Sequence, residues 1–292
     1  MNPVCGTTFC LLFSKNFVPT MHNPVPITPS LTASFRDKGF MKLERCLSET
    51  MLEHLRESVD RICAKTEQYP DLVHNETPDG TQYICGIDFL LLKDEPVFLE
   101  LLGSPLLLSI AEAICGSDFF PVQEFVVIKK LGDPSVIDWH QDVVSHSVGT
   151  TCMVGLYLDA ANEENGALKI VPGSQHMGTD ICDLKKLPAV GISTQPGDIL
   201  VHDLMVAHCS GPLTEFPQRR VVYFEFMNKP RALEDQVYSE EFITARTQLI
   251  DLAKEFYQSA SAEIPENTRL EIAAIHENLR DIKPANYCFE FH

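Results

Sequence analysis

The tetrapeptide Trp139-His140-Gln141-Asp142 carries the sharpest chemical signal in the sequence. On an extended strand, residues two apart point to the same face, so the imidazole of His140 and the carboxylate of Asp142 can reach one point. Imidazole and carboxylate groups that converge in this way are common metal ligands. Two ligands do not complete a metal site, so a third must come from another part of the chain. The His-x-Asp pattern alone is a weak signal, because it occurs often by chance.

Two further polar features follow downstream. The segment His208-Cys-Ser-Gly-Pro212 comes after the turn residues Pro196-Gly-Asp198, and Arg219 lies eleven residues beyond His208. Two histidines and one carboxylate on one side of a metal leave its other positions open, as in non-haem Fe(II) oxygenases. A buried arginine is costly unless it meets an anion, and its planar fork suits a carboxylate. A cosubstrate that chelates a metal and carries a distal carboxylate for Arg219 would explain all three features.

Short strands must position these residues, because the sequence from about residue 120 alternates β-type runs with turn residues. Gly, Pro, Asn and Asp separate the runs, a pattern typical of a sandwich or barrel. The predicted strands are Gln123–Lys130, Thr151–Leu158, Leu168–Val171, Asp198–His202 and Arg219–Met227.

Helices are predicted to frame this β core. Apolar residues recur at helical spacing over 49–65, 96–115, 239–258 and 265–281. Residues 66–82 are polar and turn-rich, and Phe35–Leu43 reads as a short entry strand. Residues 1–33, rich in Pro, Thr and Ser, predict a loosely ordered N-terminal tail. The remainder, 34–292, is expected to form a single domain with a helical extension over about 231–292.

Composition narrows the classes of function. The chain has 292 residues, of which 45% are hydrophobic, and a formal net charge of −18. That charge argues against nucleic acid or an anionic membrane as the main partner. No segment approaches the roughly 20 apolar residues that span a bilayer, and the N-terminal segment is a poor signal peptide. Ten scattered cysteines without a CxxC pair indicate a reducing compartment, so we expect a cytoplasmic protein.

The ordered set of motifs resembles the phytanoyl-CoA dioxygenase-like branch of the Fe(II)/2-oxoglutarate oxygenases. The resemblance covers roughly residues 34–230. The matching elements are Trp139–Asp142, Asn165–Leu168 leading into Val171–His176, Pro196–Asp198, and His208–Pro212 with Arg219. It implies a double-stranded β-helix, or cupin-like jelly roll, as a mostly β core with flanking helices. It also implies that His140, Asp142 and His208 bind iron, and that 2-oxoglutarate meets Arg219 and Ser210.

The sequence departs from the pattern of this family in two places. Cys209 and Leu213 stand where the family usually has Gly and often Asn. We expect Cys209 to be a small residue that faces away from the metal. Asp142 is retained, whereas halogenating relatives replace this carboxylate with a small residue, so the resemblance favours hydroxylation or a related oxidation.

Three more residues are candidates for contact with the cosubstrate, each beside a plainer alternative. Gln141 would point away from its neighbours on a regular strand, yet this position can approach 2-oxoglutarate in the family. His146 follows Asp142 by four residues and is equally compatible with a surface loop. Gln123 is a strand residue that could reach the cosubstrate. His202 is the main rival metal ligand, although a buried, hydrogen-bonded histidine explains it as well.

Two adjacent arginines compete for the inward position. Alternation within the run that begins at Arg219 favours Arg220, because its parity partners Val222 and Phe224 belong to the more apolar set. The spacing of the family favours Arg219, and an inward face at a site can be polar. Lys129 and Lys130 are interpreted as strand-end charges, and Trp139 as a core residue.

The resemblance implies a non-haem dioxygenase that uses Fe(II), 2-oxoglutarate and O₂ to hydroxylate or otherwise oxidise an unactivated C–H bond. Succinate and CO₂ would be released. The expected partner is a small organic metabolite, with neither nucleic acid nor membrane involved; its identity and the oligomeric state are not predicted. Two alternatives remain open: a cupin-like metalloenzyme that does not use 2-oxoglutarate, for which Arg219 has no purpose, and a non-catalytic jelly-roll binding protein.

Overall fold

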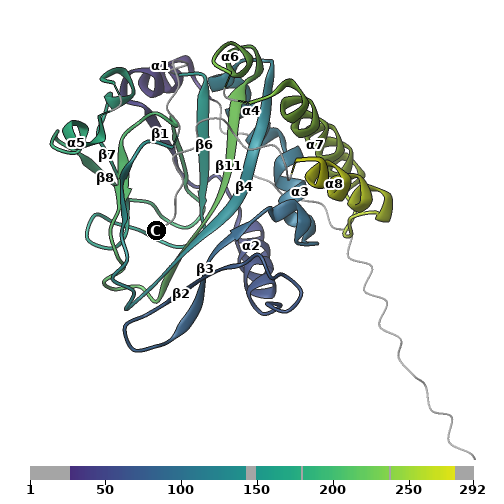
Figure 1. Cartoon of the computed structure of the whole chain (residues 1–292), viewed down its shortest axis with the longest axis horizontal. Helices are drawn as coiled ribbons and strands as arrows, with labels where there is room; N and C mark the ends of the chain where they lie inside the picture. The colour runs from purple at the N-terminus through teal and green to yellow at the C-terminus, as the bar shows by residue number, and fades with distance from the viewer. Residues whose placement is uncertain (1–26, 143–148, 179, 237, 280–292) are drawn as a thin grey trace, which may run out of the picture.

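The structure is a computed structural model that describes residues 27–142, 149–178, 180–236 and 238–279. Two antiparallel β-sheets form its centre, and helices cover one side of the larger sheet (Figure 1). The larger sheet joins β1 (Phe40–Leu43), β9 (Ile199–His202), β6 (Thr151–Tyr157), β11 (Gln218–Asn228), β4 (Phe119–Lys130), β3 (Gln82–Asp88) and β2 (Val73–Glu76), in that order. The smaller sheet joins β5 (Ile137–His140), β10 (His208–Ser210), β7 (Leu168–Ile170) and β8 (Val190–Ile192).

The larger sheet has apolar side chains on both faces, because both are covered. Along β11, Val222 and Phe224 point to the side where the helices pack, which we call the outer face. Val221 and Tyr223 alternate with them and point toward the smaller sheet, where they pack in one cluster with Ile170 of β7. We call this side the inner face. The period of two along a strand therefore separates a helix-side core from an inter-sheet core.

The five strands predicted downstream of residue 120 are confirmed, with small shifts at their ends. β4 begins at Phe119, four residues earlier than predicted, and β11 runs one residue further at each end. β5 holds the first part of the Trp-His-Gln-Asp motif and ends at His140, so Asp142 lies just after the strand.

The first predicted helix is confirmed, and the second is divided. α2 (Glu49–Cys63) begins at the N-cap Ser48, whose Oγ accepts a hydrogen bond from the Met51 N–H at 3.2 Å. The stretch 96–115 forms α3 (Pro96–Gly103) and α4 (Pro105–Cys115), not one helix. Pro105 cannot donate to the preceding turn, and Ser104 caps the new helix instead.

The C-terminal region adds α6 (Lys229–Glu234), α7 (Glu240–Ser259) and α8 (Glu266–Leu279), as the helical pattern predicts. α7 lies against α3 so closely that a Cβ on Gly103 would stand 2.0 Å from the carbonyl oxygen of Ala253. Arg246 of α7 also reaches β4, where it pairs with the carboxylate of Glu124. The helical extension is thus locked onto the outer face.

The predicted strand at Phe35–Leu43 is wrong in its first half. α1 (Pro29–Lys38) occupies that part, and β1 begins only at Phe40. Thr28 caps α1, Pro29 occupies its first turn, and Gly39 ends it at φ +81°, a conformation that glycine adopts without strain. The predicted tail, 1–33, also ends too late, since α1 begins at Pro29, and residues 1–26 lie outside the described residues.

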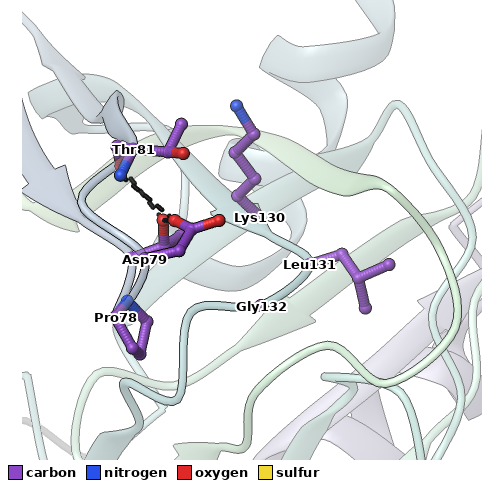
Figure 2. A pocket seen from close by; sticks show the side chains of 7 residues that line it. Pro78, Asp79, Thr81, Lys130, Leu131 and Gly132 are labelled. Carbon is purple, nitrogen blue, oxygen red and sulfur yellow. Dashed lines mark hydrogen bonds between the residues drawn. The ribbon is translucent and has the colours of Figure 1, made fainter.

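The segment read as polar and turn-rich contributes to a hairpin of β2 and β3 that extends the larger sheet at its edge. Its turn and the end of β4 line a surface hollow of about 300 Å³ (Figure 2). The residues that line the hollow are Thr77, Pro78, Asp79, Thr81, Lys130, Leu131 and Gly132. None of them is a candidate for the site chemistry described above.

Among the described residues, no single helix combines the length and the apolar composition that crossing a membrane requires. α3 and α4 meet both criteria only when taken together, and they are bent by 48° at their junction. Most of their apolar residues are buried in the helix-side core.

Candidate metal centre

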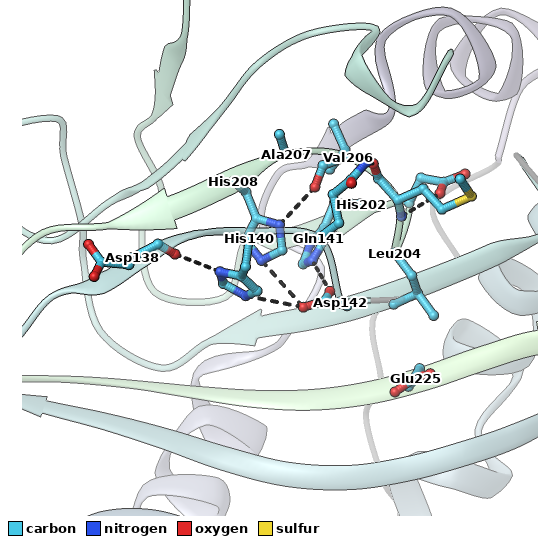
Figure 3. Close-up of polar contacts among 12 residues, drawn as sticks. Asp138, His140, Gln141, Asp142, His202, Leu204, Val206, Ala207, His208 and Glu225 are labelled. Atoms are coloured by element: carbon cyan, nitrogen blue, oxygen red, sulfur yellow. Dashed lines mark hydrogen bonds and ion pairs between the residues drawn. The ribbon is translucent and has the colours of Figure 1, made fainter. Parts of the chain in front are cut away.

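The smaller sheet brings the two ends of the predicted ligand set together. His140, the last residue of β5, lies directly opposite His208, the first residue of β10, in the antiparallel register. Asp142 follows two residues later, and its N–H donates to the carbonyl of Leu204 at 2.8 Å. One ligand atom each from His140, Asp142 and His208 lies within 4.8 Å of the others (Figure 3). Asp142 Oδ1 is 3.3 Å from His140 Nε2 and 3.6 Å from His208 Nε2.

Backbone carbonyls set the orientation of both imidazoles. His140 Nδ1 lies 2.7 Å from the carbonyl oxygen of Asp138, and His208 Nδ1 lies 3.0 Å from that of Val206. A neutral histidine that donates from Nδ1 leaves the lone pair of Nε2 toward Asp142, which is the tautomer that a metal ligand needs. Two nitrogen lone pairs and one carboxylate therefore converge, a donor set that fits a divalent iron ion.

Electrostatics favour the ligating protonation states for two of the three. Burial raises the pKa of Asp142, but the surrounding imidazoles of His208, His140 and His202 outweigh it and hold that pKa well below its ordinary range. Burial lowers the pKa of His208 to about 3, so this ring is neutral at pH 7. Burial also lowers the pKa of His140, yet the hydrogen bond and charge of Asp142 prevail and raise it.

His202 lies in the same cluster but has a different contact. It ends β9, is buried, and places Nε2 at 3.2 Å from Oδ2 of Asp142, the carboxylate oxygen that does not face the other two histidines. Its ring centroid is 4.7 Å from that of His208. This geometry gives His202 the hydrogen-bonded role, in which it orients the carboxylate of Asp142.

Arg219 lies on the inner face, beside an unexpected second cation. Its side chain is 1% exposed and donates to the carbonyl of Gly166. Directly opposite Arg219 on β4 is Lys129, whose Nζ donates to the carbonyls of Ser210 and Gly211 at 2.9 and 2.7 Å. Burial, reinforced by the charge of Arg219, lowers the pKa of Lys129 to about 7. The interpretation of Lys129 as a strand-end charge is therefore wrong, because its register buries it against Arg219.

The cationic cluster of Arg219 and Lys129, together with Ser210, contains buried polar atoms that lack partners. Within the described part of the chain, Nε of Arg219 and Oγ of Ser210 are buried without a hydrogen bond. Buried polar groups are nearly always satisfied, so unpartnered donors beside two cations fit an anionic ligand. The far carboxylate of 2-oxoglutarate would supply the missing acceptors.

Arg220 points to the outer face and is fully engaged there. Its Nε lies 2.9 Å from Oδ2 of Asp159, and its Nη1 lies 3.0 Å from Oδ1 of Asp60. Of the two adjacent arginines, the structure thus places Arg219 on the face of the triad. Apolar alternation failed here because the outer face of this sheet is the more apolar one.

The family described as phytanoyl-CoA dioxygenase (PhyH) matches residues 35–221. The chain belongs to this family. Family membership confirms the resemblance seen in the motifs. The predicted class, a non-haem dioxygenase that depends on iron, 2-oxoglutarate and O₂, is consistent with this family and with the donor set of the triad.

Individual relatives are distant. The chain is 29% identical to an L-proline trans-4-hydroxylase from Streptomyces griseoviridis, over 48% of this chain and 52% of that protein. It is 26% identical to a methylphosphonate hydroxylase from Gimesia maris, over 68% of this chain and 80% of that protein. The chain thus spans only about half the length of the proline hydroxylase. Iron-bound EctD from S. alaskensis is 20% identical, with a TM-score of 0.61 over 72% of this chain and 80% of that one; this confirms the jelly-roll fold.

The other positions suggested by the PhyH family pattern are placed as follows. The amide of Gln141 donates to the carbonyls of Met205 and Gly178. Gln123 donates to Glu225 at 2.7 Å. His146 lies outside the described residues. Cosubstrate contact therefore stays a prediction for Gln141, Gln123 and His146.

Two neighbours of the triad face away from it. On β10, the side chains of His208 and Ser210 are buried, whereas Cys209 alternates with them and is half-buried, as expected for a residue that faces away. Burial raises the pKa of the Cys209 thiol, which keeps it protonated at neutral pH. Trp139 packs, partly buried, on the small cluster of Val171, Leu184 and Ala207.

Proposed function

We propose that this protein is an Fe(II)/2-oxoglutarate-dependent oxygenase that hydroxylates, or otherwise oxidises, a C–H bond of a small organic compound. The observation that carries the proposal is the pairing of the triad with the Arg219–Lys129 cluster, which contains unpartnered buried donors. A cosubstrate-independent metalloenzyme has no use for that cluster. The retained Asp142 supports hydroxylation over halogenation. Cytoplasmic localisation stays a prediction.

The residues divide the work by position. His140, Asp142 and His208 would hold the iron, which supplies the activation of O₂ when bound. Carbonyl contacts at Nδ1 keep both imidazoles oriented, and His202 keeps the carboxylate of Asp142 in place. Arg219, Lys129 and Ser210 would take the far carboxylate of 2-oxoglutarate. This leaves the remaining inner face for the substrate, with succinate and CO₂ as the products of the cosubstrate.

Relatives supply the substrate class only coarsely. The proline hydroxylase and the methylphosphonate hydroxylase are named for small molecules. We therefore propose a small-molecule substrate for this chain as well, with neither nucleic acid nor membrane as a partner. The net charge of −18 supports the exclusion of polyanions.

The test is the anaerobic visible spectrum of the protein with Fe(II), before and after 2-oxoglutarate is added. We expect a metal-to-ligand charge-transfer band that is lost in Arg219→Ala and retained in Arg220→Ala. The second variant is the matched control, because it removes the neighbouring guanidinium from the outer face. Iron binding without a band would instead identify a metalloenzyme that does not use 2-oxoglutarate, and failure to bind iron would identify a non-catalytic jelly roll.

A further inference from the structure

The inner face of the larger sheet carries a graded ladder of side chains. β4 and β11 are antiparallel, and their inner-face residues meet in register as pairs. From one end of the ladder to the other, the pairs are Lys129 with Arg219, Val127 with Val221, Phe125 with Tyr223, and Gln123 with Glu225. The ladder therefore begins with two cations, passes through apolar and aromatic pairs, and ends with a carboxylate.

The carboxylate end of the ladder lies away from the Arg219–Lys129 cluster. Six residues of extended strand separate Arg219 from Glu225, which is about 20 Å. From Glu225 the register leads across β6 at Met153 to His202 on β9, and His202 contacts Asp142 at 3.2 Å. Figure 3 draws Glu225 on the strand that passes the triad on the side of Asp142. Glu225 thus belongs to the part of the inner face that 2-oxoglutarate, held at Arg219, leaves for the substrate.

The surroundings of Glu225 select one kind of ligand. Its side chain is 0% exposed and accepts a hydrogen bond from Nε2 of Gln123 at 2.7 Å. A buried carboxylate repels anions and favours cationic or hydrogen-bond-donating groups. The adjacent pair, Phe125 and Tyr223, stacks with ring centroids 5.0 Å apart, and aromatic faces also attract cations. Gln123 and Phe125 are only half-buried, so this end of the ladder keeps some access to solvent.

We propose that Glu225, held by Gln123, binds a protonated nitrogen of the substrate. The substrate class is then a small cationic or zwitterionic amine, oriented with its nitrogen toward Glu225 and its reacting carbon toward the triad. This inference rests on the proposed function, since the triad and the Arg219–Lys129 cluster define which end of the ladder remains for the substrate. Gln123 then serves the substrate and not the cosubstrate.

The experiment compares probes that differ only in the charged nitrogen. L-proline and piperidine-2-carboxylate carry it, whereas cyclopentanecarboxylate and cyclohexanecarboxylate are their carbocyclic counterparts. Each is added anaerobically to the protein with Fe(II) and 2-oxoglutarate, and its Kd is read from the perturbation of the charge-transfer band. Succinate release in air is the second readout. We expect the Kd of each amine to be at least about tenfold lower than that of its carbocyclic counterpart. One charge-assisted hydrogen bond contributes about that much to affinity.

Variants assign the preference to Glu225. Glu225→Gln, which keeps the shape and removes the charge, should lose the preference for amines while its charge-transfer band remains. Glu225→Asp should retain part of the preference. Glu255→Gln, on the exposed face of α7, is the control for net charge and should behave as the native protein.

The outcomes separate the two proposals. Three outcomes would overturn the inference: equal or tighter binding of the carbocyclic acids, no response to either amine, or an amine preference that survives in Glu225→Gln. In each case a charge-transfer band in the native protein would leave the proposed function standing. Absence of the band in the native protein would overturn the proposed function itself, and the inference with it.

Discussion

The two faces of the larger sheet treat buried charge in opposite ways. On the outer face, Glu124 is paired with Arg246, and Arg220 is paired with Asp159, so these charges are neutralised within the protein. On the inner face, Arg219 lies against Lys129, a second cation. A complete buried ion pair holds two elements together, whereas a buried cation beside another cation is relieved either by losing its proton or by meeting an anion. The contrast makes the cations of the inner face the candidates for ligand binding without reference to any relative.

The strongest way to break this contrast is to remove the carboxylate of the triad. Asp142→Ala should reduce Fe(II) affinity and succinate formation by well over a hundredfold, because changes even to residues behind metal ligands cost about 10- to 100-fold. Asp159→Ala on the outer face is the counterpart. It should weaken the fold and leave Fe(II) affinity unchanged, as measured by anaerobic iron titration. Native-like turnover in Asp142→Ala would refute the triad.

On the outer face, removal of a charge should lower the stability of the fold and leave ligand binding unchanged. Glu124→Gln leaves Arg246 buried without its carboxylate and should lower the free energy of unfolding by about 3–5 kcal/mol, the cost of breaking a buried ion pair. Urea denaturation measures this loss. The Kd for 2-oxoglutarate, measured on the folded variant, should not change. A large change in that Kd would mean that the two faces are coupled and that their charges do not have separate roles.

His202 lies beside the metal ligands, so its role as a hydrogen-bond partner must be distinguished from that of a ligand. It touches the carboxylate of Asp142 at 3.2 Å and does not belong to the three-residue ligand set. His202→Leu should therefore lower Fe(II) affinity by about 10- to 100-fold, with the iron still bound at high concentration. Complete loss of iron binding, equal to that of Asp142→Ala, would instead make His202 a ligand.

Site residues whose position depends on nearby sequence could be predicted, whereas those whose position depends on contacts between distant strands could not. His140 and Asp142 were predictable because residues two apart on one extended segment point to the same side, and Arg219 was chosen over Arg220 from the spacing of the family that the motifs resemble. Lys129 was missed because its burial depends on the register between β4 and β11, which lie about ninety residues apart in the chain. Glu225 was missed for the same reason.

The remaining errors in the predicted fold come from local sequence signals that were overlooked or ambiguous. The division between α3 and α4 is marked by Ser104 and Pro105, a capping residue followed by a helix-starting proline, yet the continuous apolar pattern concealed it. The β2–β3 hairpin escaped because edge strands with polar side chains resemble loops in sequence.

The subtlest expected effect concerns Lys129. Its pKa of about 7 means that the free protein loses this positive charge as the pH rises above neutrality. Burial is the main cause of this low pKa and the charge of Arg219 adds to it, whereas the nearby Asp133 and Cys209 raise it. A carboxylate bound beside Lys129 favours the protonated form, so binding of 2-oxoglutarate above pH 7 must take up a proton. The Kd should then rise with pH, by at most about tenfold per unit.

Lys129→Met isolates this contribution from every other titrating group. Its Kd for 2-oxoglutarate, read from the charge-transfer band, should be raised about tenfold at pH 6.5 and should approach that of the native protein at pH 8.5. Lys130→Met is the adjacent control: Lys130 points to the outer face, with its ammonium 5.8 Å from the ring centroid of Tyr83. It should keep the native pH profile. If the Kd of Lys129→Met and that of the native protein change with pH in parallel, Lys129 does not contact the cosubstrate. The guanidinium of Arg219 alone would then bind the far carboxylate of 2-oxoglutarate.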